Sequence, residues 1–324
     1  MQAEALGAIP AEVLQSTQPV LLRGLVAHWP LVQAARRSDA AFCDYLRGFD
    51  AGQRLMTWRG LPTIGGRFFY NDDFSGFNFA REGHTLGAVL DELLAGTADA
   101  VYMGSTAIDG ACPALRQHND LPALAGFNPL VSLWLGNRIR VATHFDLPDN
   151  MACVVAGRRR FTLFPPEQVA NLYIGPLDLT PAGQPVSLVD QAQPDLARFP
   201  RYAEALRHAQ VFELEPGDAL FLPSQWWHGV ESLDAVSGLV NFWWRQSPPY
   251  MDTPLNTLMM ALLTLRDLPP AQRDAWRALF DHYVFDADGQ TAAHIPPGAR
   301  GILDPITDHS ARQLRAMLLN RLNR

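Results

Sequence analysis

The apolar positions of this chain predict two groups of β-strands with an irregular stretch between them. Apolar and β-branched residues dominate from Leu130 to Phe164, with breaks near residues 146–150 and at Gly157, and again from Val211 to Trp244. Short apolar runs bounded by Gly, Pro and Asp are typical of buried strands. Within the first group we expect one continuous strand over residues 132–145. Residues 19–24, 67–72 and 100–104 predict shorter strands earlier in the chain.

Helical spacing of apolar residues appears on both sides of these strands. We expect a helix over residues 39–49, and another that begins after Thr85 as its N-cap and ends at Gly96. Beyond residue 250 the spacing is helical throughout, with one helix starting at Pro270 and the last one capped by Ser310. This change of period predicts two domains, 1–250 and 251–324. Residues 176–200, rich in Pro, Gly, Asp and Gln, predict a long loop that forms one wall of a substrate cleft.

Composition excludes several classes of protein. The 324 residues are 48% hydrophobic and 18% charged, which is typical of a globular chain with a sizeable core. A net charge of −7 without a Lys/Arg stripe argues against a nucleic-acid surface. No apolar run approaches the roughly 18 residues of a membrane helix, and residues 1–4 lack the features of a signal peptide. The cysteines have no metal-type spacing, so we expect free thiols in a reducing cytoplasm, at Cys43, Cys112 and Cys153.

A His-x-Asp pair and a distant histidine carry the candidate chemistry. Side chains two positions apart on a strand share a face, so His144 and Asp146 point to one place and Phe145 points away. His228 follows a turn and a second apolar strand, which brings a third ligand. Two histidines and one carboxylate form the facial triad of non-haem Fe(II) sites. The alternative is an ordinary hydrogen-bonded pair, because His-x-Asp by itself is common. No phosphate-binding glycine loop or nucleophile elbow competes with the metal hypothesis.

Several motifs together resemble a known family. They are His144-Phe145-Asp146, Asn150, Gly157 to Pro166 (GRRRFTLFPP), Pro216-Gly217-Asp218, Trp226-Trp227-His228 and Asn241-Phe242-Trp243. The chain resembles the JmjC-type, cupin-fold 2-oxoglutarate oxygenases, in the cupin-like branch that includes the asparaginyl hydroxylase inhibiting hypoxia-inducible factor. The resemblance implies a mainly β fold, a double-stranded β-helix or jelly roll with flanking N- and C-terminal helices. It also implies Fe(II) held by His144, Asp146 and His228, with 2-oxoglutarate as co-substrate and O₂ as oxidant.

The resemblance extends to the co-substrate site, with two departures. Arg159 stands where relatives carry the lysine that binds the distal carboxylate of 2-oxoglutarate, and an arginine can hold a carboxylate with two parallel hydrogen bonds. The alternative is that Arg158, Arg159 and Arg160 all face solvent, although strand alternation turns at least one inward. The second departure is Val141, in place of a threonine that bonds 2-oxoglutarate. Three further residues match positions near the co-substrate, namely Tyr102, Asn150 and Asn241, and Tyr70 resembles a tyrosine at the substrate entrance.

The implied activity is hydroxylation of a protein or peptide side chain, coupled to decarboxylation of 2-oxoglutarate to succinate. A small-molecule substrate is the alternative within the same chemistry. Val141 and Arg159 also leave open a metal-binding cupin that does not use 2-oxoglutarate, and a non-catalytic binding protein is the third possibility. The helices of residues 251–324 expose much apolar surface, so we expect a homodimer through them, the alternative being that they pack back onto the barrel.

Overall fold

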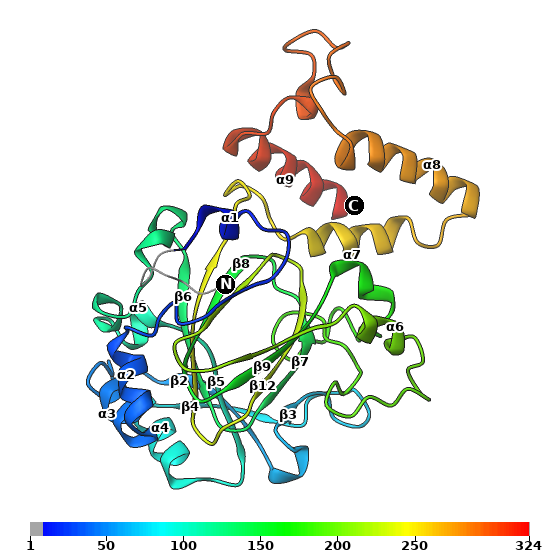
Figure 1. Cartoon of the computed structure of the whole chain (residues 1–324). Helices are drawn as coiled ribbons and strands as arrows, with labels where there is room; N and C mark the ends of the chain where they lie inside the picture. The colour runs from blue at the N-terminus through cyan, green and yellow to red at the C-terminus, as the bar shows by residue number, and fades with distance from the viewer. Residues whose placement is uncertain (1–8, 324) are drawn as a thin grey trace. The chain divides into compact units, whose positions relative to one another are not determined.

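The strands of the computed structural model, which describes residues 9–323, form two sheets that face each other. The larger sheet has eight strands in the order β1 (Val20–Leu22), β11 (Ala219–Leu222), β8 (Asp149–Ala156), β13 (Ser237–Trp244), β6 (Leu130–Gly136), β5 (Ala100–Ala107), β2 (Leu55–Gly60) and β4 (Ala80–His84). The smaller has five, in the order β10 (Gln210–Leu214), β9 (Arg159–Phe164), β12 (Trp227–Ser232), β7 (Arg140–His144) and β3 (Arg67–Phe68). All neighbours are antiparallel except β3 and β7. The predicted jelly roll is confirmed (Figure 1).

Helices cover the outer face of the larger sheet. They are α2 (Pro30–Arg37), α3 (Asp39–Arg47), α4 (Leu86–Ala95) and α5 (Ile108–Ala111). Side chains from these helices, such as Phe42 and Leu90, pack with the outward residues of the strands, such as Val240 and Phe242, in the largest apolar core. A separate apolar cluster, with side chains from both sheets, lies in the space between them. The interior therefore has an apolar part and, as shown below, a polar part.

Most strands were predicted, but β2 and β4 were not, and several boundaries differ. The expected strand over residues 132–145 is two strands, β6 and β7, which lie in different sheets and are joined at residues 137–139. A continuous apolar run cannot show where a chain crosses from one sheet to the other, so this boundary was missed. The predicted helix after Thr85 is confirmed at both ends. The Thr85 hydroxyl accepts a hydrogen bond from the backbone N–H of Ala88, and Gly96 ends the helix with a φ of 72°.

The smaller helical elements complete the first compact unit, residues 1–246. These are α1 (Ala11–Leu14), α6 (Tyr202–Arg207) and short 3₁₀ turns at Pro62–Ile64, Leu115–Gln117, Pro122–Phe127 and Pro166–Ala170. Residues 176–200 contain no helix or strand, as predicted. Residues 1–4, on which the expectation of no signal peptide rests, lie outside the described residues.

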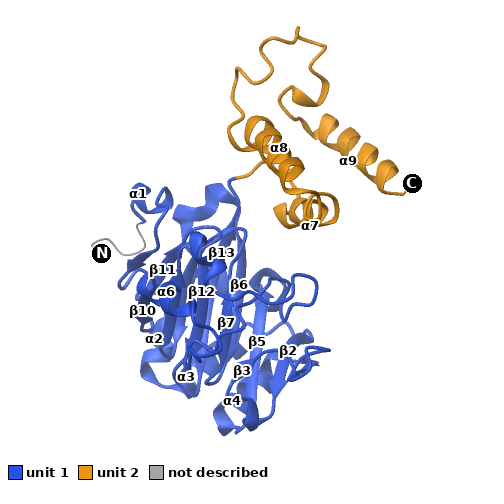
Figure 2. Ribbon diagram, turned by 90° about the vertical axis from the view of Figure 1, so that its right-hand side faces the viewer, with its two compact units in different colours: residues 1–246 blue, residues 247–324 orange. Residues whose placement is uncertain are grey.

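The second compact unit, residues 247–324, is helical (Figure 2). It contains α7 (Pro254–Thr264), α8 (Pro270–Phe280), a π-turn at Asp281–Phe285, a 3₁₀ turn at Gly301–Leu303 and α9 (Asp308–Leu322). The last helix begins one turn earlier than expected: Thr307 is the N-cap and Ser310 completes a capping box with it. None of the helices in residues 9–323 is long and apolar enough to cross a membrane.

Candidate metal centre

His144, Asp146 and His228 meet at one end of the space between the sheets. His144 ends β7 and His228 lies directly opposite it on β12, with the two ring centroids 4.3 Å apart. Asp146 lies just beyond β7, and its Oδ2 is 3.6 Å from Nε2 of His228. The three side chains each offer a ligand atom within 4.8 Å of the others. Phe145 points away, as expected, and packs against Trp227. The arrangement has the donor set of a facial triad.

Backbone carbonyls orient both imidazoles. Nδ1 of His144 lies 2.9 Å from the carbonyl oxygen of Ala142, and Nδ1 of His228 lies 2.9 Å from that of Trp226. A proton on Nδ1 makes each of these hydrogen bonds, which leaves the lone pair of Nε2 for an ion. Such a second partner is the usual device that fixes the tautomer of a metal-binding histidine.

The protonation states at this centre also suit a cation. Burial, assisted by the neighbouring His228, lowers the pKa of His144 to about 4. Burial alone would raise the pKa of Asp146, but hydrogen bonding and charge from His228 and His144 hold it below its usual value. Trp243 acts on Asp146 in the same direction, although its Nε1 has no partner with full hydrogen-bond geometry. At neutral pH the centre therefore offers a neutral His144 and a carboxylate.

A β-bulge explains the spacing of the interior residues on β7. The register of β7 and β12 shifts between His228 and Val230, so that Ala142 and Thr143 both face outward opposite Gly229. Val141 therefore returns to the interior, where it packs against both neighbouring apolar clusters. Thr143 is buried on the outside and cannot replace the interior hydroxyl that Val141 lacks.

Of the three consecutive arginines, only Arg159 enters the barrel. Arg158 pairs with Asp234, and Arg160 pairs with Glu213 and Glu231 on the outer surface. Strand alternation places Arg159 on the opposite face, where it is 2% exposed. The alternative that all three face solvent is therefore wrong.

The Arg159 guanidinium is a buried cation without an anion. Its Nε donates to Oγ of Ser237 at 3.0 Å, while one terminal nitrogen has no hydrogen-bond partner at all. No carboxylate among the described residues lies within ion-pair distance of it. Burial lowers the pKa of Arg159 to about 10, so the side chain stays charged at neutral pH. A buried charge is normally paired, and this one is left open toward the interior.

The remaining predicted residues line the same interior. The Trp134 indole donates to Oδ1 of Asn241 at 2.7 Å, and Nδ2 of Asn241 donates to Oδ1 of Asn150 at 3.2 Å. The ring of Tyr102 stacks on Trp134 with centroids 6.0 Å apart. Tyr102 also raises the pKa of Arg159 electrostatically, against the larger effect of burial. Burial raises the pKa of Tyr102, which therefore carries its proton and can donate it.

Two residues of this interior were missed by the sequence analysis. Ser237 and Trp134 hold Arg159 and Asn241, respectively, but neither belongs to a motif with known spacing. Their contacts depend on which strands become neighbours, for which a single sequence carries no signal. Tyr70, expected at the substrate entrance, donates its hydroxyl hydrogen to the carbonyl of Leu179 at 2.6 Å and so holds the loop of residues 176–200.

A groove of about 620 Å³ lies beside the ligand-bearing loops. Asp149 and Ser224 line it, and so does Trp226, two positions before His228. Its other walls come from residues 14–18 and from the turn at Pro165, Pro166 and Glu167. The groove gives the first unit a polar, open surface that is lined by sequence neighbours of the metal-site residues and by none of the three themselves.

Comparison with known proteins identifies the family of this chain. The profile of the cupin-like domain family matches residues 7–250. A lysine-specific demethylase, JMJ31, of Arabidopsis thaliana is 34% identical over 147 residues, which are 43% of this chain and 26% of that protein. The tRNA wybutosine-synthesizing protein 5 of Danio rerio is 32% identical over 162 residues, 45% of this chain and 44% of that protein.

Two further proteins are similar to this chain. HSPB1-associated protein 1 of Homo sapiens is 40% identical over 114 residues, 35% of this chain and 23% of that protein. The chain thus spans less than half the length of each of these relatives. An X-ray structure of E. coli ycfD aligns with 99% of this chain and 69% of that one, at 16% identity and a TM-score of 0.44. The family match covers most of the chain and all the residues described above, and the chain belongs to the cupin-like domain family.

Proposed function

We propose that this protein is an Fe(II)- and 2-oxoglutarate-dependent oxygenase that hydroxylates a protein or peptide side chain. His144, Asp146 and His228 would hold the iron, since their donor atoms converge and both imidazoles present Nε2. Bound there, iron and 2-oxoglutarate supply the activation of O₂, with release of succinate and CO₂. The relatives' printed names, a demethylase and a tRNA-modifying protein, fit this broad class of chemistry.

The unpaired guanidinium of Arg159 is the observation that carries the co-substrate assignment. It shares the interior with the metal centre, is almost fully buried and has a terminal nitrogen without a partner. A dicarboxylic 2-oxo acid would bind the metal with one end and pair the Arg159 guanidinium with its distal carboxylate. A guanidinium binds a carboxylate through two parallel hydrogen bonds, so replacing the relatives' lysine by arginine keeps this function.

The other interior residues would position the co-substrate. Tyr102 keeps its proton, so its hydroxyl is a donor for the carboxylate that Arg159 holds. Asn150 and Asn241 fix each other and are fixed by Trp134, which leaves their amides in one orientation beside the metal centre. Val141 contributes only an apolar contact, so the site has one hydrogen bond fewer than its relatives.

Anaerobic titration tests the proposal without knowledge of the substrate. Fe(II) and then 2-oxoglutarate are added to the purified protein while the visible charge-transfer band of the iron–2-oxo-acid chelate is followed. The band should appear in wild type and vanish in His144→Ala. Arg159→Met should bind Fe(II) as the wild type does but should need a far higher concentration of 2-oxoglutarate to form the band.

Each other outcome selects a different function. Iron binding by the wild type without the band would favour a metal-binding cupin that does not use 2-oxoglutarate. Absence of iron binding would refute the metal centre and favour a non-catalytic binding protein. The two variants separate these results from misfolding, because circular dichroism at the same concentration reports whether each variant is folded.

The open groove supports a peptide substrate rather than a small molecule. Its walls come from five separate stretches of the chain and stay open, whereas sites for small molecules usually enclose their ligand. Mass spectrometry of a cell lysate incubated with enzyme, Fe(II) and 2-oxoglutarate should find a protein with an added oxygen. A shift in the metabolite fraction alone would favour the small-molecule alternative, and a shift in tRNA would contradict the expected absence of a nucleic-acid partner.

The helical unit supports the proposed homodimer. Helices α7 and α8 contain no buried residue and α9 contains only Ala311, while the side chain of Leu263 is 76% exposed. Sedimentation of the full chain should give a dimer, and Leu263→Glu should shift it toward the monomer. The three cysteines are buried and free, which supports the proposed cytoplasmic location.

A further inference from the structure

Gln191 contacts the outside of both strands that carry the histidine ligands. Its Oε1 accepts a hydrogen bond from the Thr143 hydroxyl at 2.9 Å, and Thr143 is the chain neighbour of His144. The same carboxamide lies against Gly229, the neighbour of His228: a Cβ added to Gly229 would be 1.6 Å from Oε1 of Gln191. Gln191 therefore spans β7 and β12 at the level of the metal centre, on the face opposite the ligands.

The strands are irregular at this level. The bulge sets Ala142 and Thr143 opposite Gly229 and interrupts the regular pairing next to His144 and His228. A bulge leaves ladder groups unpaired and bends its strand. Backbone pairing alone therefore fixes the distance between the two imidazoles less firmly than in a regular ladder, and the Gln191 contact bridges the gap.

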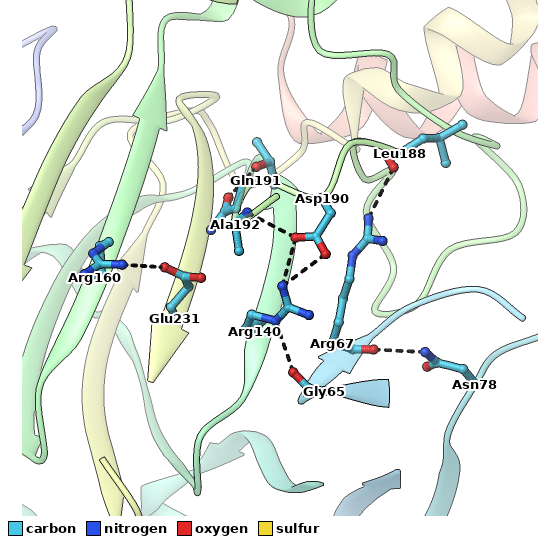
Figure 3. Close-up of polar contacts among 11 residues, drawn as sticks. Gly65, Arg67, Asn78, Arg140, Arg160, Leu188, Asp190, Gln191, Ala192 and Glu231 are labelled. Carbon is cyan, nitrogen blue, oxygen red and sulfur yellow. Dashed lines mark hydrogen bonds and ion pairs between the residues drawn. The ribbon is translucent and has the colours of Figure 1, made fainter. Parts of the chain in front are cut away.

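The loop segment that carries Gln191 is itself held firmly (Figure 3). Both carboxylate oxygens of Asp190 accept from Nη1 of Arg140, at 2.9 and 3.1 Å, while Nε of Arg140 donates to the carbonyl of Gly65. Arg67 donates to the carbonyl of Leu188 at 3.2 Å. These contacts fix residues 188–190 against β7 and β3, so Gln191 has a rigid base.

The position of Gln191 carries costs that packing alone does not explain. Its Nε2 is buried and has no hydrogen-bond partner, and an unsatisfied buried donor costs about 1–3 kcal/mol. The φ angle of Gly229 lies outside the left-handed region that favours glycine. Glycine is therefore needed there for space and not for its φ angle. Residues that weaken a fold locally often serve a site.

We propose that Gln191 is a positioning residue that sets the spacing of His144 and His228 across the bulge. It does not touch the metal, but it links the order of the loop at residues 188–191 to the geometry of the two histidine ligands. The inference rests on the proposed metal centre and deepens it. Loss of a group bonded directly to a metal ligand typically lowers metal affinity 10–100-fold, and Gln191 acts one residue further out, so its loss should have a smaller effect.

Cobalt(II) titration of the full chain tests the role without catalysis, because the visible spectrum of Co(II) reports both affinity and ligand geometry. Thr143→Val removes the hydroxyl at constant shape, and Gly229→Ala displaces the carboxamide from the other strand. Each should weaken Co(II) binding by up to about 10-fold, the lower end of the effect of a direct partner, and alter the spectrum, whereas Thr143→Ser should keep the wild-type values. The double variant Thr143→Val/Gln191→Ala should be no worse than Gln191→Ala, since both remove one interaction.

The matched control is Thr162→Val, which makes the same chemical change on β9 directly opposite Gly229. It should leave Co(II) affinity and the spectrum unchanged. Variants that lower only the melting temperature, with wild-type affinity and spectrum below it, would overturn the positioning role and leave the metal centre intact. Wild type that binds no Co(II) would overturn both.

Discussion

Arg159 makes a quantitative prediction that separates function from stability. Burial lowers its pKa from 12.5 to about 10, which corresponds to about 3 kcal/mol of unfavourable free energy, at 1.36 kcal/mol per tenfold change. Because burial lowers the pKa, it disfavours the charged form of Arg159 in the folded state. A guanidinium with a lowered pKa destabilises the folded state at every pH below about 10, so the whole effect is present at neutral pH.

Replacing Arg159 by methionine should therefore stabilise the protein when no co-substrate is bound. The variant loses the hydrogen bond to Ser237, worth about 1 kcal/mol, so the net gain is about 2 kcal/mol. For a domain of this size that is a rise in melting temperature of about 4 to 8 °C. Arg159→Lys is the control, because it keeps a buried charge and should show no gain.

The same experiment with 2-oxoglutarate should reverse the order. An excess of about 100 times the dissociation constant stabilises the wild type by about 2.7 kcal/mol, whereas Arg159→Met should gain nothing. Calorimetry of the metal-loaded proteins, with and without 2-oxoglutarate, measures both effects. If Arg159→Met melts below wild type without ligand, the charge is not a burden on the fold and the argument for an anion at this position fails.

Three further predictions concern the same interior. Tyr102→Phe should weaken 2-oxoglutarate binding about 10- to 100-fold, because a hydrogen bond to a charged group contributes about 1.5–3 kcal/mol, while equal Co(II) affinity shows that the metal centre is intact. Val141→Thr should strengthen 2-oxoglutarate binding about 2- to 10-fold, and unchanged affinity would mean that the co-substrate does not reach this face. The pKa of His144 is lowered from 6.5 to about 4, so the metal-free protein should lose up to about 3 kcal/mol between pH 6.5 and pH 4. Urea unfolding of His144→Phe should show a flatter pH dependence, and parallel slopes would contradict the assignment.

The period of the strands was enough to predict that His144 and Asp146 share a direction, because they are two positions apart. His228 was added as the third candidate because it follows a second apolar strand. Alternation also required at least one of the three arginines to turn inward, and the family resemblance pointed to Arg159. The predictions from alternation concern residues close together on one strand, where local geometry determines the direction of a side chain.

Contacts between strands could not be predicted in the same way. Ser237 reaches Arg159 from the opposite sheet, and Gln191 reaches Thr143 from a loop far along the chain. Such pairs depend on register and on the bulge at Gly229, and a single sequence records neither. The boundary between β6 and β7 was missed for the same reason, because apolar residues continue while the chain changes sheets.

The two faces of the smaller sheet differ in whether their charged side chains have ion-pair partners. On the outside, Arg140 and Arg160 have carboxylate partners. In the interior, Arg159 has none and the metal centre brings two imidazoles together with a carboxylate. A fold selected only for stability would remove or pair such groups. Their retention places the unfavourable free energy of this domain where ligands would relieve it, and for that reason iron and 2-oxoglutarate should stabilise the first unit together more than either does alone.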